Sequence, residues 1–217
     1  MALPPSLCGR LRVPVIGAPM FLVSTPPLVT ALCQAGVVGA FPHVNARPSE
    51  QLGIWLERIQ QELVAIRAKN PNQAIGPLAV NLIVHRTNAR YEPDLALVVQ
   101  HEVPLVITCL GHPGRAVEAV HGYGGLVFAD VVNAEFARKA IDAGVDGLIC
   151  VGAGAGGHAG TQSAFSLVRE IREFWDGCLV LGGAINDGYQ IRAAEVLGAD
   201  LAYIGTRFFH RRVRRGA

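Results

Sequence analysis

Short runs of apolar residues recur along the chain and alternate with longer segments in which apolar positions repeat every three or four residues. The runs predict buried strands, and the longer segments predict helices with one apolar face. Several runs are apolar at every position, which is typical of a parallel sheet covered on both faces. The predicted strands span residues 13–20, 37–41, 78–84, 105–110, 126–132, 147–152, 179–184 and 201–205. The predicted helices span residues 25–36, 49–69, 94–100, 115–121, 134–143, 163–174 and 189–197.

Three junctions between a predicted helix and the next strand share one local design, which indicates a weak internal repeat. They are Gln34–Gly39, Asp142–Gly147 and Val196–Asp200, and in each a glycine follows the helix. Glycine accepts the left-handed backbone that commonly ends a helix. Roughly eight strand–helix units, with the last helix missing, predict a (β/α)8 TIM barrel near its lower size limit. An open doubly wound sheet uses the same local units, but the number of strands favours the barrel.

Composition narrows the class of protein further. Of 217 residues, 51% are hydrophobic and 17% are charged, and 25 are glycine, which excludes a disordered chain and a coiled coil. A formal net charge of +2 predicts neither a nucleic-acid nor a membrane partner. The five cysteines are scattered, so we expect free thiols in a reducing cytoplasm rather than a metal site or a disulfide framework. We expect neither a signal peptide nor a membrane-spanning segment.

The strongest local signal is the glycine-rich segment 151–160, which contains His158 and follows the sixth predicted strand. Residues with little or no side chain let the backbone come close to a flat ligand. Barrel enzymes place catalytic groups at this end of a strand, and a histidine is suited to acid–base work or to neutralising an anion near neutral pH. A flexible loop with an incidental histidine is the alternative, at about even odds for an arbitrary glycine-rich loop.

Two further loops follow the seventh and eighth predicted strands. The first contains Gly182 and Gly183, and the second contains Gly205 and Thr206. Barrels frequently bind phosphate with these two loops, whose backbone N–H groups can surround an anion. Each loop alone could be an ordinary tight turn, but their joint position favours a phosphate site.

Three other positions interrupt the apolar pattern at strand ends. The segment Gly17–Met20 contains Pro19, whose fixed φ predicts a rigid backbone edge against a ring system. Asn81 could contact a ligand or cap the structure, and Asp130 could be a site residue or a hydrogen-bonded structural acid. The remaining histidines have no metal-ligand spacing, and most are expected on the surface or in loops.

These marks together resemble the nitronate monooxygenase family, formerly called 2-nitropropane dioxygenases. The resemblance covers roughly residues 11–208, and its matching elements follow the family's order. They are Gly17–Met20, Asn81, Ala155–Gly160, Gly182–Gly183 and Gly205–Phe208. Flavin-dependent enoyl-acyl-carrier-protein reductases share much of the same pattern.

The resemblance implies a TIM barrel that binds FMN without a covalent bond and oxidises alkyl nitronates with O2 to a carbonyl compound and nitrite. Its implied partners are a nitronate or nitroalkane and O2, and assembly into a homo-oligomer stays open. It places His158 over the flavin as the catalytic residue. It also implies a set of cofactor-binding residues: Ala18, Pro19, Met20, Asn81, Gly156, Gly157, Gly183, Gly205 and Thr206.

The sequence departs from the family at two places. Some members have a lysine near the end of strand five; in this chain that region, Phe128–Val131, contains Asp130 instead of a lysine. Family chains also continue past the segment 205–208, so we expect the last helix and a substrate-covering segment to be missing or altered. The predicted organisation is an FMN-binding barrel over residues 1–209 and a basic, disordered tail over 210–217. An NAD(P)H-dependent flavin enoyl reductase and an inactive flavin-binding barrel remnant are the alternative functions.

Overall fold

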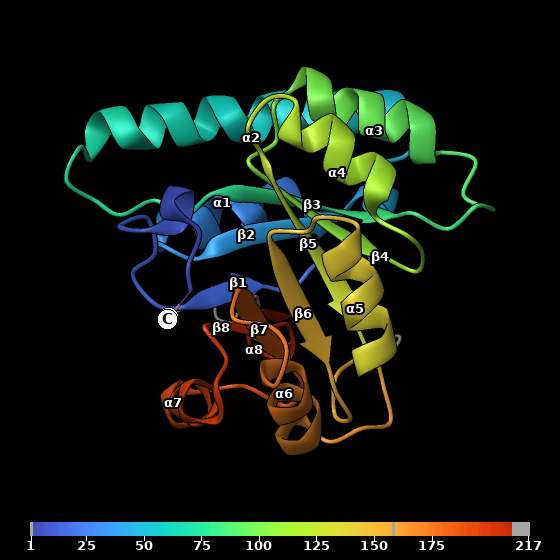
Figure 1. Cartoon of the computed structure of the whole chain (residues 1–217). Coiled ribbons are helices and arrows are strands. Elements are labelled where there is room, and N and C mark those ends of the chain that lie inside the picture. Colours follow the sequence, from blue (N-terminus) through green and yellow to red (C-terminus); the bar gives the residue numbers. More distant parts are fainter. Residues whose placement is uncertain (1, 158, 210–217) are drawn as a thin grey trace.

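The computed structural model describes residues 2–157 and 159–209, and within them eight parallel strands form a closed barrel (Figure 1). Each strand pairs with its neighbours in the sequence, and β1 also pairs with β8, which closes the barrel. The predicted TIM barrel is therefore confirmed, and the open sheet is excluded. The strands are β1 (Val15–Gly17), β2 (Val38–Pro42), β3 (Leu78–Ile83), β4 (Leu105–Cys109), β5 (Leu126–Val131), β6 (Gly147–Val151), β7 (Cys178–Gly182) and β8 (Leu201–Ile204).

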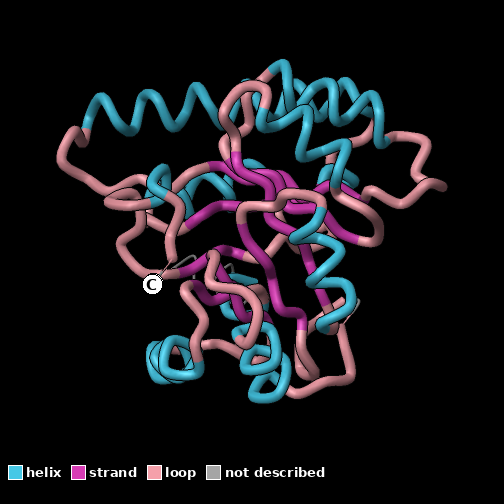
Figure 2. Tube along the Cα trace, viewed as in Figure 1, coloured by secondary structure: helices cyan, strands magenta, loops and turns pink. Residues whose placement is uncertain are grey.

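Helices surround the barrel on its outside, so that the strands lie at the centre of the molecule (Figure 2). The described helices agree with the predicted ones to within three residues at each end, except that a short α8 follows β8. They are α1 (Pro26–Gln34), α2 (Ser49–Lys69), α3 (Tyr91–Gln100), α4 (Gly114–His121), α5 (Ala134–Asp142), α6 (Ala164–Arg172), α7 (Gly188–Leu197) and α8 (Thr206–Phe209).

Alternate residues of the strands belong to two separate hydrophobic clusters, which explains why the strands are apolar throughout. On β4, Leu105 and Ile107 belong to the cluster inside the barrel, while Val106 packs in the cluster beneath the helices. Phe128 and Ile149 fill the barrel interior in the same way. Both faces of each strand are thus removed from water, as a parallel sheet requires.

The ends of the helices follow the predicted local chemistry. Gly36, Gly144 and Gly198, the three glycines of the repeat, all have a positive φ, of 76°, 86° and 121° respectively. At the opposite ends, the Asn133, Ser163 and Asp187 side chains accept hydrogen bonds from backbone N–H groups in the first turns of α5, α6 and α7. These caps fix the places where the loops after β5, β6 and β7 give way to helix.

The N-terminal segment closes the end of the barrel at which the strands begin. A short 3-10 helix, η1 (Pro5–Leu7), places Leu7 in the interior cluster, where 1% of the residue is exposed. The backbone N–H of Ala2 donates a hydrogen bond to Asp200, directly before β8. The barrel interior is therefore filled by apolar side chains at this end.

Two expectations concern features outside the barrel itself. The predicted basic tail, residues 210–217, lies outside the described residues. Among the residues that the structure describes, no helix combines the length and the apolar character needed to cross a membrane.

Candidate active site

A cavity of about 1330 Å³ opens at the ends of the strands where the predicted site residues lie. Typical small-molecule pockets measure about 300–1,000 Å³, so this one has room for a cofactor and a further small molecule. The nine residues expected to bind a cofactor all line it, although they come from five separate segments. They are Ala18, Pro19, Met20, Asn81, Gly156, Gly157, Gly183, Gly205 and Thr206.

The segment after β1 forms a fixed, mostly apolar wall of this cavity. The Ala18 N–H donates to the carbonyl of Ile204 over 2.8 Å, which ties the segment to β8. The Met20 N–H donates to the Ser24 hydroxyl over 2.9 Å, and the Asn45 side chain donates to the Met20 carbonyl over 3.0 Å. With Pro19 between them, these contacts hold the backbone edge rigid, as the sequence predicts.

Glycines form the opposite wall, between β6 and β8. Gly183 has a φ of 129°, and a Cβ at this position would approach the Ala155 nitrogen to 3.2 Å. Around Gly156 and Gly157, by contrast, an added Cβ would meet no atom within 4 Å, so their backbone borders open space in the cavity. Exposed backbone N–H groups in such a wall suit an anionic group of a ligand.

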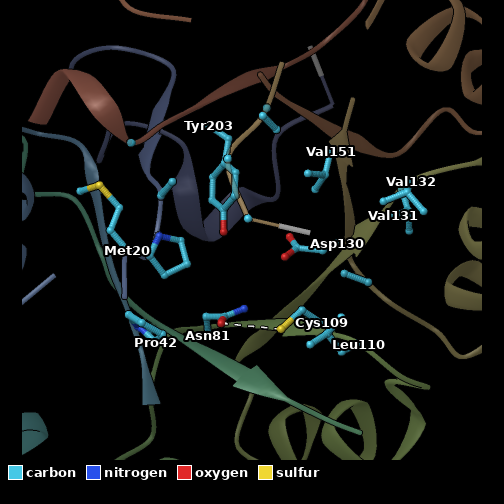
Figure 3. Close-up of a pocket in the computed structure, with 18 of the residues that line it drawn as sticks. Met20, Pro42, Asn81, Cys109, Leu110, Asp130, Val131, Val132, Val151 and Tyr203 are labelled. Carbon is cyan, nitrogen blue, oxygen red and sulfur yellow. Dashed lines mark hydrogen bonds between the residues drawn. The ribbon is translucent and has the colours of Figure 1, made fainter. Parts of the chain in front are cut away.

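Polar side chains near the ends of the strands form the floor of the cavity (Figure 3). The Asn81 side chain donates to the carbonyl of Ile107 over 3.2 Å, and its oxygen accepts from the Cys109 thiol over 3.7 Å. Asn81 thus has a structural role and also lines the cavity. Burial, together with the nearby Asp130, raises the pKa of the Cys109 thiol to about 12, so the thiol stays protonated.

Asp130 on β5 and Tyr203 on β8 also reach this floor. Figure 3 shows the carboxyl and the hydroxyl directed toward the same part of the cavity. The Oδ1 of Asp130 and the hydroxyl of Tyr203 are both buried without a hydrogen-bond partner among the described residues. Removal from water raises the pKa of Asp130 to about 7, and burial with the nearby Asp130 raises the pKa of Tyr203.

Three described basic residues also line the cavity. Arg47 stacks on the ring of Phe21, with its guanidinium carbon 5.2 Å from the ring centre. Lys139 on α5 donates to Glu135 over 2.6 Å, and His112 accepts from the N–H of Gly114 over 3.2 Å. The charges of Arg47 and Lys139 favour the approach of an anion to the cavity.

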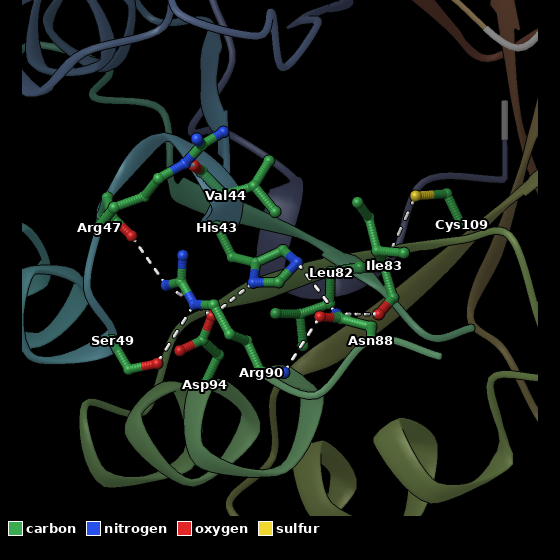
Figure 4. A network of polar contacts seen from close by, with 11 residues as sticks. His43, Val44, Arg47, Ser49, Leu82, Ile83, Asn88, Arg90, Asp94 and Cys109 are labelled. Atoms are coloured by element: carbon green, nitrogen blue, oxygen red, sulfur yellow. Dashed lines mark hydrogen bonds and ion pairs between the residues drawn. The ribbon is translucent and has the colours of Figure 1, made fainter. Parts of the chain in front are cut away.

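His43 is an exception to the expectation for most of the histidines, since it is fully buried in a short 3-10 helix, η2 (His43–Asn45), after β2. Its Nδ1 bonds the carboxylate of Asp94 on α3, and its Nε2 lies 3.4 Å from the Asn88 amide nitrogen (Figure 4). Arg90 pairs with the same carboxylate over 2.9 Å and donates to the carbonyl of Ala46. Burial alone would raise the pKa of Asp94, but the hydrogen bonds from His43 and Ser49 lower it. This network fixes the loops after β2 and β3 and does not line the cavity.

The expected catalytic residue, His158, lies outside the described residues, so its place relative to the cavity stays a prediction. Sequence reasoning named Asp130 as a candidate but missed Tyr203. The sequence feature that could have identified Tyr203 is a phenol in the otherwise apolar run 201–204, close to Gly205 of the expected phosphate loop. A metal site was not expected, and no cluster of three or more metal-binding side chains occurs among the residues described.

The sequence model of the family described as nitronate monooxygenase matches residues 8–211. The chain belongs to this family. It is 28% identical to a nitronate monooxygenase from Neurospora crassa, over 89% of this chain and 59% of that protein. The chain thus spans about three fifths of the length of this curated relative.

Solved structures with the same fold include two with a high overall similarity. FabK from Thermotoga maritima has a TM-score of 0.80 and 26% identity, over 94% of this chain and 60% of that one. A nitroalkane oxidase from Streptomyces ansochromogenes has a TM-score of 0.77 and 24% identity, over 94% of this chain and 68% of that one. The latter identity supports the fold alone. The sequence-based assignment to the nitronate monooxygenase family and to the TIM barrel is therefore confirmed.

Membership of the nitronate monooxygenase family implies a flavin cofactor, and the cavity fits one in three respects. Its volume exceeds that of an ordinary ligand pocket. Glycine backbone borders open space where an anionic group can approach, at Gly156 and Gly157. Two buried polar atoms on the floor, Oδ1 of Asp130 and the hydroxyl of Tyr203, have no hydrogen-bond partner among the described residues. A ligand with a phosphate and a polar aromatic ring would use all three features.

Proposed function

We propose that the protein binds FMN in this cavity and oxidises alkyl nitronates with O2, giving a carbonyl compound and nitrite. The observation that carries the proposal is the convergence of all nine expected cofactor residues on one cavity at the catalytic end of a barrel. Membership of the nitronate monooxygenase family supports the same reaction class. The chain spans only 59% of the Neurospora crassa relative, so the activity of that protein does not carry over by itself and has to be measured on this chain.

The walls of the cavity divide the work of binding. Gly183, Gly205 and Thr206 would hold the phosphate, as the loops after β7 and β8 do in many barrels. The wall from Ala18 to Met20 would lie along the ring system, because its backbone is fixed by hydrogen bonds at both ends. When bound, the flavin supplies the electron chemistry that no protein side chain can supply.

The residues of the chain contribute to the reaction in two ways: they bind the anionic substrate in a mostly apolar cavity, and one of them donates or accepts a proton. His158 is proposed as the acid–base group, which binds the nitronate as a donor or takes a proton from the neutral nitroalkane. The basic side chains around the cavity, Arg47 and Lys139, favour entry of an anionic substrate. The apolar lining from Val131 and Val132 lowers the local polarity and strengthens these charge interactions.

The first test is the visible spectrum of the purified chain, followed by nitrite release from propyl-2-nitronate in air. We expect a bound-flavin spectrum and nitrite formation. The substitution His158→Asn should reduce turnover of the neutral nitroalkane by about 10²–10⁴-fold while flavin stays bound, because it removes the group proposed to take the proton. His121→Asn on α4, whose ring bonds Asp146 far from the cavity, is the matched control and should retain activity.

The outcomes separate the parts of the proposal. A colourless protein that does not take up added FMN would contradict the cofactor assignment. A flavin-loaded protein without nitrite release would contradict the reaction, and unchanged turnover of His158→Asn would remove that residue from the mechanism.

One other function is favoured by a specific observation, the likeness to FabK. This second candidate is an NAD(P)H-dependent flavin reductase that acts on an enoyl thioester. Rapid bleaching of the flavin by NADH under anaerobic conditions, without nitrite release from nitronates in air, would select it over the oxidation of nitronates.

A further inference from the structure

The two unpartnered polar groups on the cavity floor have no structural role to explain them. Asp130 and Tyr203 come from β5 and β8, and both reach the inside of the barrel end. Buried polar groups in folded proteins nearly always have hydrogen-bond partners, so two orphans in one cavity point to a ligand that supplies them. For Asp130 it is Oδ1 that is buried, while the residue as a whole is half-buried and lines the cavity.

Among residues 2–157 and 159–209, no basic side chain is paired with Asp130 to keep it ionised. Asp130 raises the pKa of Cys109 on β4 and of Tyr203 on β8, so both neighbouring groups stay protonated and neutral. Asn81 on β3 is uncharged and is already bonded to Ile107 and Cys109. Within the described ranges, no side chain forms an ion pair with Asp130.

The basic residues that line the cavity are engaged elsewhere. Lys139 on α5 bonds Glu135, and Arg47 lies on the ring of Phe21 and donates to the carbonyl of Val44. His112, after β4, accepts from the N–H of Gly114 through its Nδ1. Desolvation therefore acts on Asp130 without compensation and raises its pKa to about 7. A protonated carboxyl is a hydrogen-bond donor, whereas the carboxylate can only accept.

We propose that the protonated carboxyl of Asp130 and the hydroxyl of Tyr203 form the polar contacts from the cavity floor to the flavin ring, so that proton loss from Asp130 weakens flavin binding. This inference rests on the proposed flavin cofactor. A flavin ring carries several carbonyl and nitrogen acceptors, which a protonated carboxyl and a phenol can both satisfy. The carboxylate offers those acceptors only a negative charge, in a site of low polarity.

The sign and the size of the effect follow from proton linkage. If only the protonated form donates to the flavin, affinity is full below the pKa of Asp130 in the free protein and falls as the pH rises above it. With a pKa of about 7, the dissociation constant rises about tenfold between pH 6 and pH 8. Tyr203 stays protonated in this range because its pKa is raised, and so it adds no pH dependence.

The test measures the dissociation constant of FMN by quenching of flavin fluorescence at pH 6 and pH 8. The unmodified protein should bind about tenfold more weakly at pH 8, relative to the variant Asp130→Asn, whose amide donates at both pH values. The phosphate of FMN also titrates near pH 6, but this contribution is common to both proteins and cancels in the comparison. Asp142→Asn, an exposed carboxyl at the end of α5, is the matched control and should keep the full pH dependence.

Two further measurements do not depend on the folding of Asp130→Asn. Riboflavin has no phosphate, so its affinity for the unmodified protein should itself fall about tenfold from pH 6 to pH 8. Tyr203→Phe should weaken FMN binding by about three- to tenfold at both pH values, because one hydrogen bond is lost.

Each outcome supports or contradicts the inference. Parallel pH profiles for the unmodified protein and Asp130→Asn, or a flat profile for riboflavin, would overturn it and leave the proposed cofactor intact. Binding that strengthens with pH relative to Asp130→Asn would overturn it as well. If the unmodified protein binds no flavin at any pH, both this inference and the proposed function fail.

Discussion

Gly183 shows how a single backbone position can determine the shape of a ligand site. Its φ of 129° is a conformation that residues with a Cβ rarely adopt, and a Cβ here would approach the Ala155 nitrogen to 3.2 Å. The loop after β6 therefore packs directly against the turn after β7. This contact places two of the walls of the cavity side by side.

We expect Gly183→Ala to weaken FMN binding and to lower the free energy of unfolding by about 1–3 kcal/mol, through backbone strain at this turn. Gly188→Ala, at the first residue of α7, is the matched control, since an added Cβ there meets no atom within 4 Å. Fluorescence titration and urea unfolding of both variants provide the measurement. Equal behaviour of the two variants would contradict the role given to Gly183.

At the scale of elements, the strand and helix pattern could be predicted from the sequence because both strand faces are buried and three helix ends carry glycine. The apolar runs located all eight strands, and α2 was predicted with the bounds that the structure gives, Ser49–Lys69. The four-residue α8 was missed, because so short a helix leaves no apolar period to detect.

The candidate site could be predicted only in part. Glycines and prolines mark their backbone roles in the sequence, so the walls were found. Tyr203 and the burial of His43 depend on which neighbours the barrel brings together, and a single sequence does not carry that information.

The capping aspartate of α7 permits a prediction at this scale. Asp187 accepts a hydrogen bond from the N–H of Gln190 over 3.0 Å, four residues after the turn at Gly183. Asp187→Ala should lower the free energy of unfolding by about 1 kcal/mol, because the N–H of Gln190 in the first turn of α7 loses its acceptor. Asp187→Ser keeps an acceptor and should retain most of the stability in urea unfolding. A serine variant as unstable as the alanine variant would show that capping is not the cause.

At the scale of the whole molecule, the barrel interior is divided between an apolar filling and a polar floor under the cavity. Phe128 is fully buried in the interior cluster and precedes Asp130 by two residues on β5, so it packs directly below the floor. The ring also occupies the space next to Gly147, where a Cβ would approach it to 2.7 Å. The aromatic ring thus supports both the strand packing and the base of the site.

Removing this ring should destabilise the whole barrel. Phe128→Ala should lower the free energy of unfolding by about 3–5 kcal/mol, since the closed interior can collapse only partly around the lost volume. Phe165→Ala is the matched control, because that side chain on α6 is 75% exposed and should change stability by less than about 0.5 kcal/mol. Urea unfolding monitored by circular dichroism compares the two, and similar losses would contradict the packing argument.

Because η1 and Leu7 close one end of the barrel, they determine the order in which ligands can bind and leave. With that end filled, every molecule that reaches the floor must pass through the same mouth. A ligand bound at the floor is covered by the ligand that binds after it, and so it cannot dissociate first. A flavin seated on Asp130 and Tyr203 would therefore have to load before any substrate, and the smaller reactants would exchange above it at each turnover.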